Sequence, residues 1–236
     1  MCTVTLVRKE GKIIITSNRD ERASRPASHK PELQLVGNKK LLFPKDPLAG
    51  GSWFVIDDDS NVGVLLNGAD KPHAIKPSYR LSRGVILLNL LAASSPINEW
   101  QKIDLTEIEP FTVILTQGRQ SYQLQWNETA KNMVSLEHSG NFIWSSATLY
   151  TEDVIQARAK WFNTFLNEFP EATPQQLREF HKYTKGNDPK NGLVINRDNI
   201  VLTQSITQAI IENNKVELHH DDLLTSNAYT NSLLIV

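Results

Sequence analysis

Cys2 is the only cysteine in the chain, and it directly follows Met1. Its small side chain favours removal of the methionine, which would leave a thiol and a free α-amine on the same residue. An α-amine titrates near pH ~7.7–8.0 and a thiol near pH ~8.5, so at neutral pH the amine can act as a base for the thiol. A weak nucleophile needs such a base within hydrogen-bond reach. Cys2 therefore predicts an N-terminal nucleophile, although a single cysteine at position 2 can also arise by chance.

Two short β-branched runs follow the cysteine, over residues 3–7 and 12–16, and a segment with Gly11 separates them. Strands bounded by a glycine-containing turn predict a β-hairpin. With a two-residue loop, Cys2 lies opposite Arg19, and directly opposed residues have Cβ atoms roughly 4.5–5.5 Å apart. The hairpin therefore brings the end of its second strand beside the N-terminus.

The end of that second strand carries a polar tripeptide. A loop one residue longer or shorter would place Asn18 or Asp20, in place of Arg19, opposite Cys2. A cation there would lower the pKa of the thiol, and a carboxylate could hold the amine. The same tripeptide recurs at residues 196–198 between two apolar runs, where we expect a hairpin turn. The tripeptide is therefore uninformative by itself. The prediction that residues 18–20 lie beside Cys2 depends on their distance from it along the chain.

The chain resembles the NRDE family, also called the transport and Golgi organisation protein 2 family, over most of its length. The N-terminal motifs are specific and the later ones are looser. The matching motifs are Met1-Cys2, Ser17-Asn18-Arg19-Asp20-Glu21, Ser24-Arg25-Pro26, Gly50-Gly51-Ser52-Trp53, Asn67, Ser82-Arg83-Gly84 and Trp144-Ser145-Ser146. The family looks like a branch of the N-terminal nucleophile (Ntn) hydrolases, close to penicillin V acylases and bile salt hydrolases. The resemblance implies an α+β fold, a four-layer αββα sandwich of two mainly antiparallel sheets, over a single domain of residues 1–236.

The resemblance also implies roles for residues near the N-terminus. Cys2 would attack a linear, non-peptide amide carbonyl of a small acylated substrate, with its own α-amine as base. Asn18 and Asp20 would orient that amine, and Arg19 would shape the local charge. Asn67 would offer a side-chain N–H to the developing oxyanion, and one well-aimed donor is typically worth ~2.7–4 kcal/mol. The alternative for Asn67 is a simple turn.

Three further residues are candidates for substrate binding. Gly50-Gly51 ahead of Trp53 predicts a positive φ or a close backbone approach, which would bring this strand near the thiol. Arg83 is expected at the start of a helix, and its alternative role is to bind a substrate carboxylate. Ser146 stands where many sequences of the family have Asn, an oxyanion-hole candidate.

A second hypothesis is that the protein has the hydrolase scaffold but does not hydrolyse amides. The acylases carry an arginine where this chain has Ser17, and they carry another late in the chain, with no counterpart in residues 200–236. These departures favour a haem or lipid/acyl-CoA binding and trafficking protein. The partner is therefore a small acyl amide or a hydrophobic ligand, with haem among the candidates.

The composition is that of an ordinary soluble globular protein. The 236 residues carry a formal net charge of −1, with 40% hydrophobic and 22% charged residues, so nothing favours nucleic acid or an anionic membrane. No signal peptide or membrane span is expected, and a single cysteine allows no internal disulfide. The P-loop and Gly-x-Gly-x-x-Gly motifs are missing, so we expect no nucleotide. We expect a cytoplasmic protein without a cofactor.

Strand-forming runs dominate the chain, and helices are expected in two blocks, which favours antiparallel sheets. A polar, proline-rich stretch at 21–48 predicts a long surface loop. Helices are expected at 81–93, 152–169 and 174–182. Further strands are expected at 52–56, 62–66, 111–116, 121–126, 133–137, 142–145, 193–195, 200–203, 205–211, 216–219 and 233–236.

Two clusters have some resemblance to metal sites. His219 and His220 are neighbours on an expected strand, so their side chains should point to opposite faces and not share one ion. Asp57, Asp58 and Asp59 lack the glycine and glutamate spacing of a calcium loop. We therefore expect a structural or surface role for both clusters.

Overall fold

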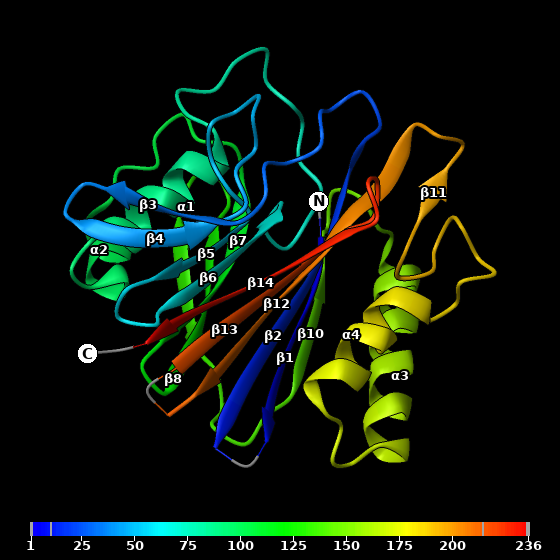
Figure 1. The fold of residues 1–236 in the computed structure, drawn as a ribbon. Helices are drawn as coiled ribbons and strands as arrows, with labels where there is room; N and C mark the ends of the chain where they lie inside the picture. Colours follow the sequence, from blue (N-terminus) through cyan, green and yellow to red (C-terminus); the bar gives the residue numbers. More distant parts are fainter. Residues whose placement is uncertain (1, 10, 214, 235–236) are drawn as a thin grey trace.

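The computed structural model describes residues 2–9, 11–213 and 215–234, and of Cys2 it describes the backbone alone. In this part of the chain, two antiparallel sheets lie face to face, and a pair of helices flanks the outer side of each (Figure 1). The layers follow the order helix, sheet, sheet, helix. This arrangement confirms the α+β class and the αββα sandwich.

The first sheet has the N-terminal hairpin in its interior. Its strands run in the order β10-β1-β2-β12-β13-β14, and β11 pairs with β12. The strands are β1 Cys2–Lys9, β2 Lys12–Arg22, β10 Phe142–Ser145, β11 Asn196–Arg197, β12 Val201–Glu212, β13 Lys215–Asp222 and β14 Asn227–Leu234. The long strands β2 and β12 lie side by side at its centre, so the sheet joins the two ends of the chain.

The second sheet is a meander in which each strand pairs with the next along the chain. Its strands are β3 Glu32–Val36, β4 Lys39–Phe43, β5 Phe54–Asp57, β6 Val62–Asn67, β7 Phe111–Gln117, β8 Gln120–Trp126 and β9 Lys131–Ser135. Strands β5, β6 and β7 are almost wholly buried because they have a sheet on one side and helices on the other.

Two helices cover each sheet. Helices α1 (Arg83–Ala92) and α2 (Pro96–Lys102) lie on the second sheet, and α3 (Glu152–Glu168) and α4 (Pro174–Tyr183) lie on the first (Figure 1). Helix α4 begins at a capping box, because the Thr173 side chain accepts from the Gln176 N–H and the Gln176 side chain accepts in return. The expected helix starts near residues 151 and 173 are confirmed.

Helix α1 approaches the second sheet closely at Gly63 of β6. A Cβ atom there would lie 2.6 Å from a methyl carbon of Leu91 and 2.8 Å from one of Leu87. The absence of a side chain therefore lets the helix reach the strand. Helices α3 and α4 pack on the hairpin through a separate apolar cluster, formed by Val7, Ile14, Phe162, Ala172, Leu177, Phe180 and Leu193.

Some expected elements are wrong. Residues 21–48 do not form one long loop, because β3 and β4 form a hairpin there around Gly37 with φ 60°. The buried run Leu41–Phe43 supplies the apolar contacts that hold this hairpin to the rest of the sheet. Helix α2 was not expected. Residues 193–195 are not a strand, and the strands expected at 200–203 and 205–211 are one strand, β12, with a bulge at Gln204.

No helix in the described ranges combines the length and the apolar character needed to cross a membrane.

Candidate functional site

The register of the β1–β2 hairpin is the one expected from a two-residue loop. Lys9 pairs with Lys12, and Cys2 pairs with Arg19. The Cys2 side chain itself lies outside the described residues. The backbone nevertheless places the first residue of β1 beside the Asn18–Asp20 segment of β2.

The alternation of β2 divides its polar tripeptide between the two faces of the first sheet. Arg19 faces the second sheet, where its guanidinium carbon lies 4.4 Å from the centre of the Trp53 ring. Asn18 and Asp20 face the opposite side, toward α3 and α4, and both are fully buried. Arg19 and Asp20 can therefore act from different sides of the same strand.

Asp20 is held by two hydroxyl groups from distant parts of the chain. Thr203 donates to Oδ1 and Tyr150 donates to Oδ2, each at 2.6 Å. Burial raises the pKa of the carboxyl group, while the nearby charge of Arg158 and the two hydroxyl donors oppose that rise. In the described part of the chain, no cation lies within ion-pair distance of this carboxylate.

Asn18 connects β2 to the helical layer. Its Nδ2 donates to the carbonyl oxygens of His181 and Leu193, at 3.0 and 2.8 Å. Because the amide N–H groups are committed to carbonyls, Oδ1 must accept from Nδ1 of His181. The other ring nitrogen then accepts from the Thr5 hydroxyl at 2.8 Å. Burial lowers the pKa of His181 to about 3, so the ring is neutral at neutral pH.

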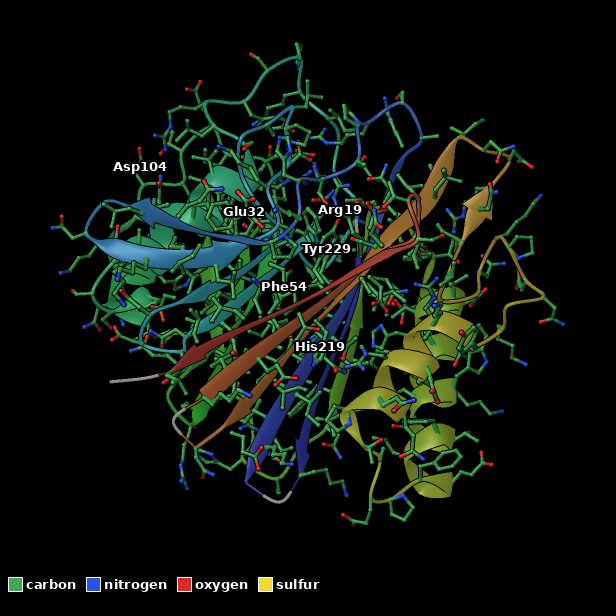
Figure 2. The ribbon with its side chains drawn as sticks, in the orientation of Figure 1. Arg19, Glu32, Phe54, Asp104, His219 and Tyr229 are labelled. Atoms are coloured by element: carbon green, nitrogen blue, oxygen red, sulfur yellow. The ribbon has the colours of Figure 1, made fainter. Side chains whose placement is uncertain are left out.

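Arg19 belongs to a buried charge cluster on the other face. Its guanidinium donates to Gln204 and, at 2.6 Å, to Asp46. Asp46 also accepts from Arg25 at 2.7 Å and from the backbone N–H groups of residues 48 and 49. Burial opposes the charge of Asp46, but these donors outweigh it, and the pKa of the carboxyl lies below its usual range. Figure 2 shows Arg19 near the centre of the molecule, where the ends of the two sheets meet.

A cavity of about 360 Å³ opens beside this cluster, between β5, β6 and the first turn of α1. Its apolar lining residues include Leu48, Trp53 and Leu65. Its charged lining residues include Arg83 and Glu109, which form an ion pair at 3.0 Å. The full lining is Glu21, Arg25, Asp46, Leu48, Ala49, Gly51, Ser52, Trp53, Leu65, Asn67, Ser82, Arg83, Gly84 and Glu109.

The two glycines before this strand have the positive φ and the close backbone approach that were predicted for them. Gly50 has φ 71°. A Cβ atom on Gly51 would lie 2.3 Å from the carbonyl carbon of Gly84, so the strand and the start of α1 touch through bare backbone. Arg83 is the first residue of α1, which confirms the expected helix start.

Asn67 lines the cavity, and Ser146 contacts the Asn67 backbone. Asn67 ends β6, and its carbonyl accepts a 2.7 Å hydrogen bond from the Ser146 hydroxyl. Ser146 does not line the larger cavity; it lines a neighbouring one of about 50 Å³, which Asn67 also lines. The structure thus brings Trp53, Asn67 and Arg83 to one cavity and places Ser146 behind Asn67.

Sequence reasoning missed Tyr150, Thr203 and His181, which bind Asn18 and Asp20, and Arg158, whose guanidinium lies over the Tyr150 ring. Each lies more than a hundred residues away along the chain, and none belongs to a recognisable motif. Their only signal is structural, since a buried carboxylate or amide requires polar partners.

The two metal-like clusters have protein partners. His220 is buried beside the Thr207 hydroxyl, at 2.8 Å, and its pKa is lowered to about 4 by burial, whereas His219 contacts Glu217. The carboxylates of the Asp57–Asp59 group lie close to one another, and the Lys39 ammonium binds among them.

Solved structures with a similar fold include one named as a hydrolase and one named as an amidase. A mutant of a conjugated bile acid hydrolase from Clostridium perfringens matches with a TM-score of 0.50, 11% identity and coverage of 98% of this chain and 96% of that one. An N-acylethanolamine-hydrolyzing acid amidase orthologue from Caenorhabditis elegans matches with a TM-score of 0.60, 12% identity and coverage of 88% and 92%. The chain has the Ntn-hydrolase fold.

The family follows from sequence. The model of the family described as Transport and Golgi organisation 2 matches residues 1–229, and the chain belongs to this family. No protein with a curated description matches the chain by sequence.

Proposed function

We propose that the protein hydrolyses a linear amide bond of a small acylated substrate, with Cys2 as the nucleophile after removal of Met1. Support comes from the Ntn-hydrolase fold, the register of the hairpin and the cavity beside it. The specific roles below extend beyond these findings.

The observation that carries the proposal is the environment of Asp20. This carboxylate is fully buried, yet its hydrogen-bond partners among the described residues are two neutral hydroxyl groups. Asp20 follows Arg19, the partner of Cys2, so it lies level with the end of β1, where removal of Met1 would expose the α-amine of Cys2. A buried carboxylate is costly without a counter-ion. Asp20 would orient the α-amine of Cys2, and the amine would become its counter-ion once it has taken the thiol proton.

The reaction uses the amine as a proton carrier. The amine takes the thiol proton, and the sulfur attacks the amide carbonyl to form a tetrahedral intermediate. Asn67 stabilises the oxyanion from β6, and the Ser146 hydroxyl braces the Asn67 backbone. The ammonium then gives its proton to the leaving amine as the C–N bond breaks. Water, deprotonated by the same amine, hydrolyses the thioester and restores the thiol.

The cavity suits a small substrate. Its volume of about 360 Å³ lies toward the lower end of typical ligand sites, which span roughly 300–1,000 Å³. The lining residues Leu48, Trp53 and Leu65 would contact the acyl chain, and Arg83 would contact a polar substituent. Arg19 would act through its charge on the thiol.

A panel of acyl amides tests the proposal on protein that has lost Met1, as checked by intact mass. We expect turnover by the wild type and a loss of at least a thousandfold in Cys2→Ala, because the nucleophile is removed from a chain end without disturbing the core. Asp20→Asn should also lose activity, since the amine loses its counter-ion.

A haem and fatty-acid titration of the same samples serves as the control. Turnover that persists in Cys2→Ala would contradict the proposed mechanism. Tight ligand binding by both proteins without turnover would favour the carrier hypothesis instead.

A further inference from the structure

Arg158 of α3 is a buried cation whose partners are neutral. Its side chain is fully buried, which is rare for arginine. Nη1 donates to the Thr3 hydroxyl, Nε and Nη2 donate to the Asn191 carbonyl at 3.2 and 3.1 Å, and Nη2 also donates to the Gly192 carbonyl. Within the described ranges, no carboxylate forms an ion pair with this guanidinium. A buried arginine with such partners needs a compensating charge farther away.

That charge lies on Asp20, one aromatic ring away. The guanidinium carbon of Arg158 is 3.7 Å from the centre of the Tyr150 ring, and the Tyr150 hydroxyl donates to Asp20 at 2.6 Å. Two opposite charges are thus buried on either side of one tyrosine. In an interior of low dielectric constant, attraction across such a spacing remains strong.

The same guanidinium also contacts the strand that carries the nucleophile. Thr3 follows Cys2 in β1, and its hydroxyl accepts from Arg158. Thr3 pairs with Asn18 and not with Asp20. Arg158 therefore contacts β1 directly and Asp20 through Tyr150, so one side chain links the two parts of the proposed centre.

We propose that Arg158 is a positioning residue for the nucleophile: it keeps Asp20 in its carboxylate form across Tyr150 and fixes Thr3, so that the α-amine of Cys2 meets a charged acceptor. The inference rests on the proposed function, because it gives Asp20 the task of holding that amine. Arg158 itself touches neither substrate nor the reacting atoms.

The charged and titratable groups around Asp20 support this assignment. Tyr150 has a pKa well above its ordinary value because of burial and the Asp20 charge, so it remains a donor. His181 is neutral at neutral pH, because burial lowers its pKa to about 3. Arg197 lies farther out, with its guanidinium carbon 5.2 Å from the Tyr150 ring, and is only partly buried. Arg158 is therefore the buried cation best placed to act on Asp20.

The test measures two titrations by NMR in protein that has lost Met1. A 13C label on the aspartate carboxyls, assigned with Asp20→Asn, reports the Asp20 carboxyl. A 15N-cysteine label reports the α-amine of Cys2 alone, because the chain has one cysteine. We expect Arg158→Met to raise the pKa of Asp20 by about one unit or more, because an opposing positive charge is lost. Arg158→Lys should recover most of the shift.

Two further variants make the test specific. Tyr150→Phe keeps the ring but removes its hydroxyl donor, so it should raise the pKa of Asp20 in the same direction. If Arg158→Met does not fold, Arg158→Gln, which removes the charge but keeps a donor for Thr3, takes its place. Arg197→Met is the matched control, and solvent screening should leave the Asp20 titration within a few tenths of a unit. A purely structural Arg158 would lower thermal stability without moving this titration.

The outcomes separate this inference from the proposed function. If Asp20→Asn leaves the titration of the Cys2 amine unchanged, the amine does not contact Asp20 and both ideas fall. If Asp20→Asn lowers the pKa of the amine while removal of the Arg158 charge leaves the pKa of the Asp20 carboxyl unchanged, only the role of Arg158 is overturned.

Discussion

Asn18 and Asp20 of β2 face the helical layer, and the groups that satisfy them are buried with them. Burying a polar group without a partner costs roughly 1–3 kcal/mol. The loss of one of these hydrogen bonds would therefore cost more than the bond itself contributes to stability, because it would leave a buried polar group unsatisfied. Asp20, the proposed acceptor for the Cys2 α-amine, is therefore held by residues whose protonation states are fixed by burial. His181, neutral and fully buried, is the group whose titration is most accessible to experiment.

Protonation of His181 predicts a loss of stability in acid. Its folded pKa of about 3 lies below the ordinary value of 6.5, so between these values the unfolded chain binds a proton that the folded protein does not. The free energy of unfolding should fall as the pH drops through this window, by up to about 1.4 kcal/mol per pH unit for one such group. His181→Asn, which can still donate to Asn18, should be less stable at pH 7 but show a flatter decline down to pH 4.

Urea denaturation at several pH values measures this effect. Protonation of Asp20 favours the folded protein in acid, since its raised pKa makes the folded protein bind the extra proton. Protonation of His220 disfavours the folded protein in acid, as that of His181 does, because its pKa is lowered. Both contributions cancel when wild type and His181→Asn are compared. Parallel curves for the two proteins would show that His181 is not buried in its neutral form.

At the level of elements, sequence reasoning succeeded where a local pattern determined the structure. The β-branched runs and Gly11 gave the hairpin, and its register gave the pairing of Cys2 with Arg19. It failed in residues 21–48, where charged and proline residues obscured two short strands held by the buried run Leu41–Phe43. Sequence reasoning could not predict that Tyr150 and Arg158 belong to the site, because their position near the end of β2 depends on how the helical layer packs against the sheet.

The contact between Gly51 and Gly84 supports a prediction for the cavity. Gly51→Ala would place a Cβ atom 2.3 Å from the Gly84 carbonyl carbon, and a backbone atom cannot move aside as a flexible side chain can. We expect a loss of about 1–3 kcal/mol in the free energy of unfolding, together with weaker substrate binding, because the first turn of α1 must move away from the strand.

Thermal unfolding and KM for an active acyl amide measure the two effects. Gly186→Ala is the matched control, because a Cβ atom there meets nothing closer than 3.4 Å. A Gly51→Ala variant with the stability and KM of wild type would show that the strand and α1 do not approach this closely in solution.

At the scale of the whole molecule, the two sheet faces have different roles. The space between the sheets is mainly apolar, with Arg19 and its partners at one end, whereas the space between the first sheet and α3 and α4 contains the polar partners of Asn18 and Asp20. Side chains at the end of β2 reach both spaces, because Arg19 contacts Trp53 and Asp20 contacts Tyr150. The class and the layers could be predicted from strand-rich patterning and the family resemblance. The order of strands and the meeting of residues 20, 150, 158 and 203 required the folded chain.

The most direct test of the central claim is intact-mass analysis of protein without Met1, quenched in acid within seconds of mixing with an acyl amide. We expect a mass increase equal to the acyl group, located on Cys2 by peptide mapping, and no such adduct in Cys2→Ala. Cleavage of the amide with the acyl group on another residue, or with the methionine still in place, would contradict the N-terminal nucleophile.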